Sequence, residues 1–255
     1  MHKNSPLPKN YETGPSAKVT LEGHESITVD LYSHEGFELL SNLWIKVGAH
    51  FRLMYEPTWL GRQIIQFPTD IVAFQEIVWN VKPDVIIETG VAHGGSLILS
   101  ASLLELCGHG KVIGIDVDIR DHNRKAIDAH PLRRRIELIE GSSIDVETID
   151  RVRGMLNPSD KVLVVLDSNH SDEHVFNELE AYGDMVSLGS YIVANDGAQA
   201  WVWDTPNGKP EWKLSHPLQA IERFLSSHPE FAVDPQPTRW LITQSPQGYL
   251  QRVSI

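Results

Sequence analysis

The side chains best suited to metal chemistry fall in two short stretches of the sequence. Asp167 opens the stretch 167–170, and Asn195 and Asp196 follow a second apolar run. Carboxylate and amide oxygens are hard ligands that suit Mg²⁺, and water and a substrate oxygen can complete its coordination. Asp167, Asn195 and Asp196 therefore predict a Mg²⁺ site. Each of them taken alone also suits a helix cap or a turn.

A histidine lies close to this predicted metal site. His170 follows Asp167 by three residues, so it could accept a proton from a hydroxyl whose pKa the metal lowers. Histidine titrates near neutral pH, which favours it as a base. The alternative is a hydrogen-bonded loop histidine, one of 12 in the chain. His93 is a second candidate base, although its position favours a role in contacting a cofactor or in packing.

A glycine-containing turn, Glu88–Ser96, follows an apolar run and opens a helical pattern. Its glycines let the backbone approach a ligand, the helix N-terminus offers unpaired N–H groups to a carboxylate, and Ser96 adds a hydroxyl. The spacing lacks both the Gly-x-Gly-x-x-Gly of dinucleotide folds and the Lys-Ser/Thr ending of a P-loop. Hydride and phosphoryl transfer are therefore disfavoured, and an ordinary tight turn is the alternative to a ligand site.

The arrangement Glu-x-Gly-x-x-x-Gly-x-Ser, followed by an acid at the end of the next strand, resembles the S-adenosylmethionine (SAM) site of Rossmann-like methyltransferases. The resemblance implies that Asp116 binds the ribose hydroxyls, since a carboxylate can accept two O–H bonds, and Asp118 is a weaker candidate for this role. The segment after the third strand resembles the one that meets the adenine ring. The implied cofactor residues are Glu88, Gly90, His93, Gly94, Ser96, Asp116, Ser142, Ser143 and Asp167.

The elements that must position these residues alternate between β-branched runs and helical patterns after Pro83. This alternation predicts an α/β fold of the Rossmann-like class I methyltransferase type, with a mostly parallel seven-stranded sheet and helices on both faces. Ligands bind beyond the carboxyl ends of the strands in such sheets. The expected strands are Val85–Glu88, Val112–Asp116, Ile136–Glu140, Val162–Asp167, Tyr191–Asn195, Trp240–Thr243 and Tyr249–Val253, with helices such as Ser96–Cys107 and Asp172–Tyr182 between them.

Three regions are expected along the chain: a polar arm over residues 1–34, a helical extension over 35–82 and the core over 83–255. Apolar residues spaced by three and four predict a helix from Glu35 to Phe51, and a second helix is expected to start after Pro68. Residues 197–217 are predicted to form an irregular loop that acts as a substrate lid. Its three tryptophans suit either stacking on a substrate or packing in an oligomer interface.

Composition excludes several classes of protein. Hydrophobic residues make up 41% of the chain and charged residues 22%, which favours a globular protein. The net charge of −12 repels polyanions, which disfavours nucleic acid and anionic membranes as partners, and a small molecule is expected. The single cysteine cannot form an intrachain disulfide, and no stretch approaches the roughly 18 apolar residues of a membrane span. A cytoplasmic homo-oligomer is expected.

Five segments together resemble the cephalosporin hydroxylase and rhamnosyl O-methyltransferase family. They are residues 57–61, 64–70, 83–90, 112–120 and 166–171, within a resemblance that runs from about Pro57 to Val253. The resemblance implies a SAM-dependent, Mg²⁺-assisted methyltransferase that acts on sugars or natural products, with Asp167, Asn195 and Asp196 as metal ligands.

The strand ends also resemble catechol O-methyltransferase, which carries its catalytic lysine at the position of His170. One departure from the family pattern concerns the metal site: Asn195-Asp196 stands where Glu-Asp is expected, so the site has one negative charge fewer. N-methylation of an amino sugar and a non-catalytic SAM-binding subunit remain open alternatives. A hydroxylase is disfavoured because no 2-His-1-carboxylate iron set is apparent.

Overall fold

The computed structural model describes residues 16–19 and 27–254. The chain divides into two compact units, residues 1–44 and 45–255, and helix α1 (His34–His50) runs across the boundary between them. In the first unit, β1 (Ser16–Val19) pairs with β2 (Ile27–Asp30) in antiparallel register. These two strands were not predicted from the sequence, although the β-branched run at 27–29 favours one of them. The remainder of the predicted arm, 1–15 and 20–26, lies outside the described residues.

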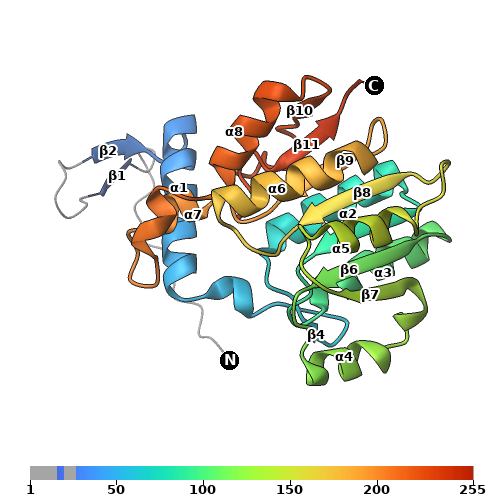
Figure 1. Ribbon diagram of the computed structural model, residues 1–255. Coiled ribbons are helices and arrows are strands. Elements are labelled where there is room, and N and C mark those ends of the chain that lie inside the picture. The colour runs from blue at the N-terminus through green and yellow to red at the C-terminus, as the bar shows by residue number, and fades with distance from the viewer. Residues whose placement is uncertain (1–15, 20–26, 255) are drawn as a thin grey trace. The chain divides into compact units, whose positions relative to one another are not determined.

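A seven-stranded sheet organises the second unit, in the order β10-β11-β9-β8-β5-β6-β7 (Figure 1). Strand β11 runs antiparallel to both of its neighbours, and the other paired strands are parallel. The predicted α/β fold with a mostly parallel sheet is therefore confirmed. The strands are β5 (Val85–Thr89), β6 (Lys111–Asp116), β7 (Ile136–Glu140), β8 (Val162–Leu166), β9 (Tyr191–Ala194), β10 (Phe231–Val233) and β11 (Tyr249–Arg252).

Helices cover both faces of this sheet (Figure 1). The face towards which Ile86 points packs against α2 (Pro68–Val81), α3 (Gly95–Cys107) and α4 (Asp121–Asp128). The face towards which Ile87 points packs against α5 (Val146–Arg153), α6 (Asp172–Tyr182) and α8 (Pro217–Ser227). Every residue of β5 is buried, as expected for a central parallel strand that is covered on both sides.

The shorter elements lie in the connections between these helices and strands. They are the pair β3 (Thr58–Trp59) and β4 (Arg62–Gln63), the helix α7 (Gln199–Val202), and 3₁₀ turns at Leu53–Tyr55, Arg133–Arg135, Gly183–Met185 and Pro210–Lys213. Helix α7 and the last of these turns fall inside the segment 197–217, whose predicted function as a lid stays a prediction. Among the described residues, none of the helices has the length and apolar character that a membrane span needs.

The prediction of a strand at Trp240–Thr243 is wrong. These residues form a turn and an irregular segment, with Leu241 at a φ of 61°, and the strand beside β11 is Phe231–Val233 instead. Phe231 is buried against Phe224 of α8, which gives β10 its place at the sheet edge. The hydroxyl of Thr243 donates a hydrogen bond to the buried carboxylate of Asp70 in α2. This β-branched residue therefore contacts α2 instead of pairing with a neighbouring strand.

The order of the strands reverses between β5 and β8, where Thr89 lies opposite Leu166. Such a switch point is where open α/β sheets bind ligands. Gly90, next along the chain, has a φ of 90°, and a Cβ atom there would lie 2.0 Å from the carbonyl oxygen of Asp167. Glycine is therefore required for the loops after β5 and β8 to approach each other, and the fold brings the two predicted sites together.

Candidate active site

The glycine turn after β5 is held by side chains from other elements. Arg62 of β4 donates from Nε to the carbonyl oxygen of His93 at 3.0 Å, and Asn123 of α4 donates to the carbonyl oxygen of Ala92 at 2.7 Å. Arg62 also donates to Asn123 at 3.0 Å. This network supports the turn at Ala92, whose φ is 43°. No sequence pattern points to Arg62 or Asn123, because only folding brings them next to the turn.

Asp116 ends β6 and reaches the same turn from the neighbouring strand. Its Oδ2 accepts the backbone N–H groups of Val91 at 2.8 Å and Ala92 at 3.3 Å, and its Oδ1 accepts that of Asp118 at 3.1 Å. The predicted ribose acid is therefore in contact with the predicted cofactor turn. Its binding to a ribose stays a prediction.

A first cavity, which we call the turn cavity, opens beside the glycine turn. It encloses about 670 Å³, counting the part open to solvent. Of the residues implied as cofactor contacts, Gly90, His93, Ser96 and Asp167 line it. Its lining does not include Glu88, Gly94, Asp116, Ser142 or Ser143.

Glu88 faces the interior of the protein rather than the turn cavity. Its side chain is 1% exposed and lines a small inner cavity together with Gln66, Asp70, Ser96 and Asn195. Burial raises the pKa of Glu88 to about 7, although hydrogen bonds from serine hydroxyls of α3 lower it. The predicted cofactor carboxylate is thus a buried group that titrates near neutral pH.

Ser143 is also turned inward. Its side chain lies 3.1 Å from Nε2 of His174, and its carbonyl oxygen accepts the hydroxyl of Tyr182 at 2.7 Å. Ser168 lies 3.1 Å from the same nitrogen of His174 and donates to Glu178 at 2.6 Å. The loops after β7 and β8 are therefore tied together through α6. The expected contact of Ser143 with adenine stays a prediction.

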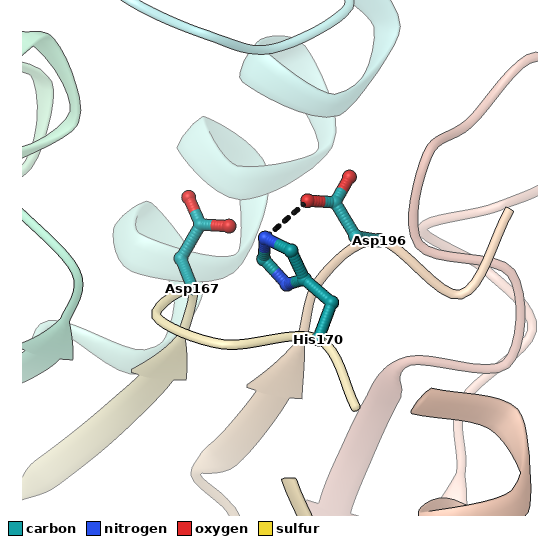
Figure 2. A group of neighbouring side chains, drawn as sticks. All are labelled: Asp167, His170 and Asp196. Atoms are coloured by element: carbon teal, nitrogen blue, oxygen red, sulfur yellow. Dashed lines mark ion pairs between the residues drawn. The ribbon is translucent and has the colours of Figure 1, made fainter. Parts of the chain in front are cut away.

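Three side chains of the second predicted site gather beyond β8 and β9 (Figure 2). Ligand atoms of Asp167, His170 and Asp196 lie within 4.8 Å of one another, and Nε2 of His170 is 2.9 Å from Oδ2 of Asp196. Asp196 adopts a left-handed backbone conformation with a φ of 62°, which aspartate tolerates better than most residues. The two carboxylates and the histidine thus form one cluster, as their positions at the strand ends predict.

The charges in this cluster shift the pKa values of its side chains. Burial raises the pKa of Asp167 well above its usual range, and the nearby charge of Asp196 raises it further. Burial lowers the pKa of His170, but the carboxylates of Asp196 and Asp167 outweigh this effect and raise the pKa to about 9. His170 therefore carries a proton at neutral pH in this arrangement, whereas residue type alone predicts a base that is ready at neutral pH.

Asn195 lies behind the cluster rather than within it. Its side chain is 4% exposed, and its Oδ1 accepts the hydroxyl of Ser245 at 2.8 Å. Hydrogen bonding by Asn195 lowers the pKa of Asp167. Asn195 lines the inner cavity, while Asp167 and Asp196 both line the turn cavity. Its role as a metal ligand stays a prediction.

A larger cavity, which we call the junction cavity, adjoins the turn cavity. It encloses about 1190 Å³, counting the part open to solvent, and its walls include Phe67, Val202 and Trp212. The two cavities share Tyr55, Ile65, His170 and Asp196 in their linings. A molecule bound in one cavity and a molecule bound in the other would therefore meet at His170 and Asp196.

Of the three tryptophans in the predicted lid, Trp212 lines the junction cavity, and Trp201 and Trp203 are not part of its lining. The ammonium group of Lys213 lies 4.8 Å from the ring centre of Trp203, an example of a cation–π contact. The segment therefore contributes one indole ring to the cavity wall.

Comparisons with known proteins agree with the fold. Residues 51–253 match the family model Rhamnosyl O-methyltransferase/CmcI. The rhamnosyl O-methyltransferase of Mycobacterium tuberculosis is 27% identical over 202 residues, 76% of this chain and 78% of that protein. The protein of the same name from Mycobacterium leprae is 27% identical over 176 residues, 68% of this chain and 72% of that protein.

Two solved structures share the fold. A CmcI structure with Mg and SAM has a TM-score of 0.58 at 22% identity and covers 78% of each chain. An O-methyltransferase from Bacillus cereus in complex with SAH has a TM-score of 0.51 at 17% identity, over 76% of this chain and 81% of that chain.

Proposed function

The chain belongs to the rhamnosyl O-methyltransferase/CmcI family, and from this membership we propose that it transfers the methyl group of SAM to a hydroxyl of a sugar or glycosylated natural product with the help of Mg²⁺. The chain is a SAM-dependent methyltransferase. The observation that supports the proposal best is the meeting of the turn cavity and the junction cavity at His170 and Asp196. Methyl transfer needs a donor and an acceptor aligned at one point, because positioning supplies much of the rate enhancement.

The residues around the turn cavity suit SAM. Gly90 and Ser96 line the cavity, with Ser96 at the start of α3, and the left-handed backbone of Gly90 lets the loop after β8 lie directly against it. Gly90, His93 and Ser96 would hold the methionine part, with Asp116 at the ribose. When bound, SAM supplies a sulfonium-bound methyl group that can be displaced by an oxygen nucleophile.

The cluster at the junction suits a hard divalent cation. Asp167 and Asp196 offer carboxylate oxygens at the edge of the turn cavity, and Asn195 lies directly behind Asp167. Asp167, Asn195 and Asp196 would hold Mg²⁺. When bound, the ion lowers the pKa of a hydroxyl that it contacts.

In this proposal, His170 at the junction of the two cavities accepts a proton from the acceptor hydroxyl. The hydrogen-bonded pair of His170 Nε2 with Asp196 Oδ2 fixes the orientation of the imidazole ring. Only the neutral ring can accept a hydroxyl proton, so His170 acts as a base once the negative charge that raises its pKa is compensated.

The walls of the junction cavity suit an acceptor with an apolar part. Phe67, Val202 and Trp212 exclude water from the point of transfer, and an indole ring can stack on the apolar face of a sugar. A small-molecule acceptor fits this cavity. The expectations of a cytoplasmic location and a homo-oligomeric state stay predictions.

The test is turnover of a panel of rhamnosides and related glycosides with SAM and Mg²⁺, followed by mass spectrometry for a product that is heavier by one CH₂ group. We expect EDTA to suppress turnover and Mg²⁺ to restore it. Asp167→Asn should lose turnover, while Asp184→Asn, in an exposed ion pair with Arg153, should keep it. Full turnover after exhaustive chelation would contradict the metal part of the proposal, and lack of SAH binding would contradict the whole of it.

A further inference from the structure

A buried carboxylate at the start of α2 organises the segment that follows the irregular turn near Leu241. Asp70 accepts the hydroxyl of Thr243 at 2.5 Å and the backbone N–H of Gln244 at 2.9 Å, and the hydroxyl of Tyr249 lies 3.3 Å away. Asp70 is 4% exposed, and its three donors are all buried. A carboxylate suits this position because it can accept several hydrogen bonds at once.

The same segment continues from Asp70 towards the metal edge. The backbone N–H of Ser245 donates to the hydroxyl oxygen of Thr243 at 2.9 Å, and the hydroxyl of Ser245 donates to Oδ1 of Asn195 at 2.8 Å. Ser245 is 0% exposed. A continuous relay of hydrogen bonds thus leads from Asp70 through Thr243 and Ser245 to Asn195.

The segment 242–245 depends on these contacts for its position. It is not part of a strand, and the first turn of α2 binds it twice, through Asp70 and through the hydroxyl of Thr69, which donates to the carbonyl oxygen of Ile242 at 2.5 Å. The carbonyl oxygen of Gln244 also accepts the backbone N–H of Ala198 at 3.0 Å. The start of α2 therefore sets where the hydroxyl of Ser245 lies.

Asn195 needs such a partner, because the terminal amide of an asparagine can rotate and present either its oxygen or its nitrogen. In the structure the amide oxygen of Asn195 accepts the hydroxyl of Ser245, and this contact holds the amide in one orientation. The side chain of Asn195 also lies beside Asp167. An amide left free to rotate would change what Asp167 faces.

We propose that Ser245 is a positioning residue for the Mg²⁺ site, which acts by fixing the side chain of Asn195, and that Asp70 and Thr243 hold Ser245 in place. The inference rests on the metal part of the proposed function. Groups that orient metal ligands from behind are a general feature of metal sites, and their loss weakens metal binding without removing a ligand.

The experiment is calorimetric titration of the full chain with Mg²⁺ and, separately, with SAH. We expect Ser245→Ala to raise the dissociation constant for Mg²⁺ by about 10- to 100-fold, the range seen when such orienting groups are removed. The dissociation constant for SAH should stay within about twofold, since Ser245 is not part of the lining of the turn cavity. Thermal melting checks that the variant is folded.

Ser190→Ala is the matched control. Ser190 is also 0% exposed and precedes β9, at the strand end opposite to Asn195, and its hydroxyl has no hydrogen-bond partner among the described residues. Both dissociation constants should be unchanged in this variant. Thr243→Val provides a second test if Ser245→Ala does not fold, because it removes the hydroxyl that links Ser245 to Asp70 while keeping the shape.

A double-mutant cycle separates this role from general support of the fold. If Ser245 acts through Asn195, then Ser245→Ala adds no further loss of Mg²⁺ affinity in an Asn195→Ala background. An equal loss in both backgrounds, or wild-type Mg²⁺ affinity in Ser245→Ala and Thr243→Val, would overturn the inference alone. If the wild-type chain binds no Mg²⁺, the metal part of the proposed function fails and this inference fails with it.

Discussion

Replacing Glu88 by glutamine is expected to stabilise the protein in a manner that depends on pH. The side chain is 1% exposed at the end of β5, and burial raises its pKa from 4.5 to about 7 against the hydrogen bonds of Ser96 and Ser100. A pKa that is higher in the folded state means that the folded state favours the protonated carboxyl. Ionisation therefore costs stability as the pH rises.

The magnitude follows from the two pKa values. Since one pKa unit corresponds to about 1.4 kcal/mol, a pKa that moves from 4.5 to about 7 corresponds to about 3 kcal/mol of unfolding free energy. Below pH 4.5 both states are protonated and this contribution to stability is fully present. It is lost between pH 4.5 and about 7, and the loss is complete above that range. Glutamine carries no charge, so the unfolding free energy of Glu88→Gln does not fall by this amount as the pH rises.

Denaturant unfolding of both proteins across this pH range provides the measurement. The stability gained by Glu88→Gln relative to the wild type should grow by about 3 kcal/mol from pH 4.5 to pH 8. Glu137→Gln, at an exposed position on β7, is the control and should show no comparable change. A difference between Glu88→Gln and the wild type that stays constant with pH would refute the reasoning, because only the burial of an ionising group predicts the pH dependence.

Two further predictions concern binding and turnover. Asp116→Ala should weaken SAH binding by at least about 1.5 kcal/mol in calorimetry, because it removes the predicted ribose contact and the acceptor of two N–H groups of the glycine turn; equal binding by the variant and the wild type would contradict the assignment. His170→Ala should lower kcat by about 10²- to 10⁴-fold in steady-state assays and leave the dissociation constant for SAH nearly unchanged; a loss of SAH binding in proportion to activity would make His170 a structural or cofactor contact instead.

The sequence by itself determined the sheet and the loops that carry the site. Buried strands such as β5 and β8 are near-continuous apolar runs, and the glycine turn that follows β5 has a local signature of its own. Because parallel strands joined by helices all end at the same edge, the acids after them were expected to gather there. Asp167, His170 and Asp196 do so.

The sequence could not determine contacts between segments far apart in the chain. The run Trp240–Thr243 looks like a strand, yet Thr243 is bound to Asp70 of α2 and the strand beside β11 lies elsewhere. The direction of the Ser143 side chain likewise depends on α6, where His174 meets it. Local patterns carry no information about such pairings, because they report which face of an element is apolar and not what packs against it.

Only the tertiary structure decided how the site residues behave electrostatically. Residue type alone gives His170 a pKa near neutrality, whereas its burial beside Asp196 and Asp167 raises that pKa to about 9. The same holds for Glu88, whose carboxyl titrates near neutral pH because helix α3 and the sheet remove it from water. The sequence specifies which ionisable group a residue carries. The charge of that group depends on the distances to other charges and on the solvent exposure that folding creates.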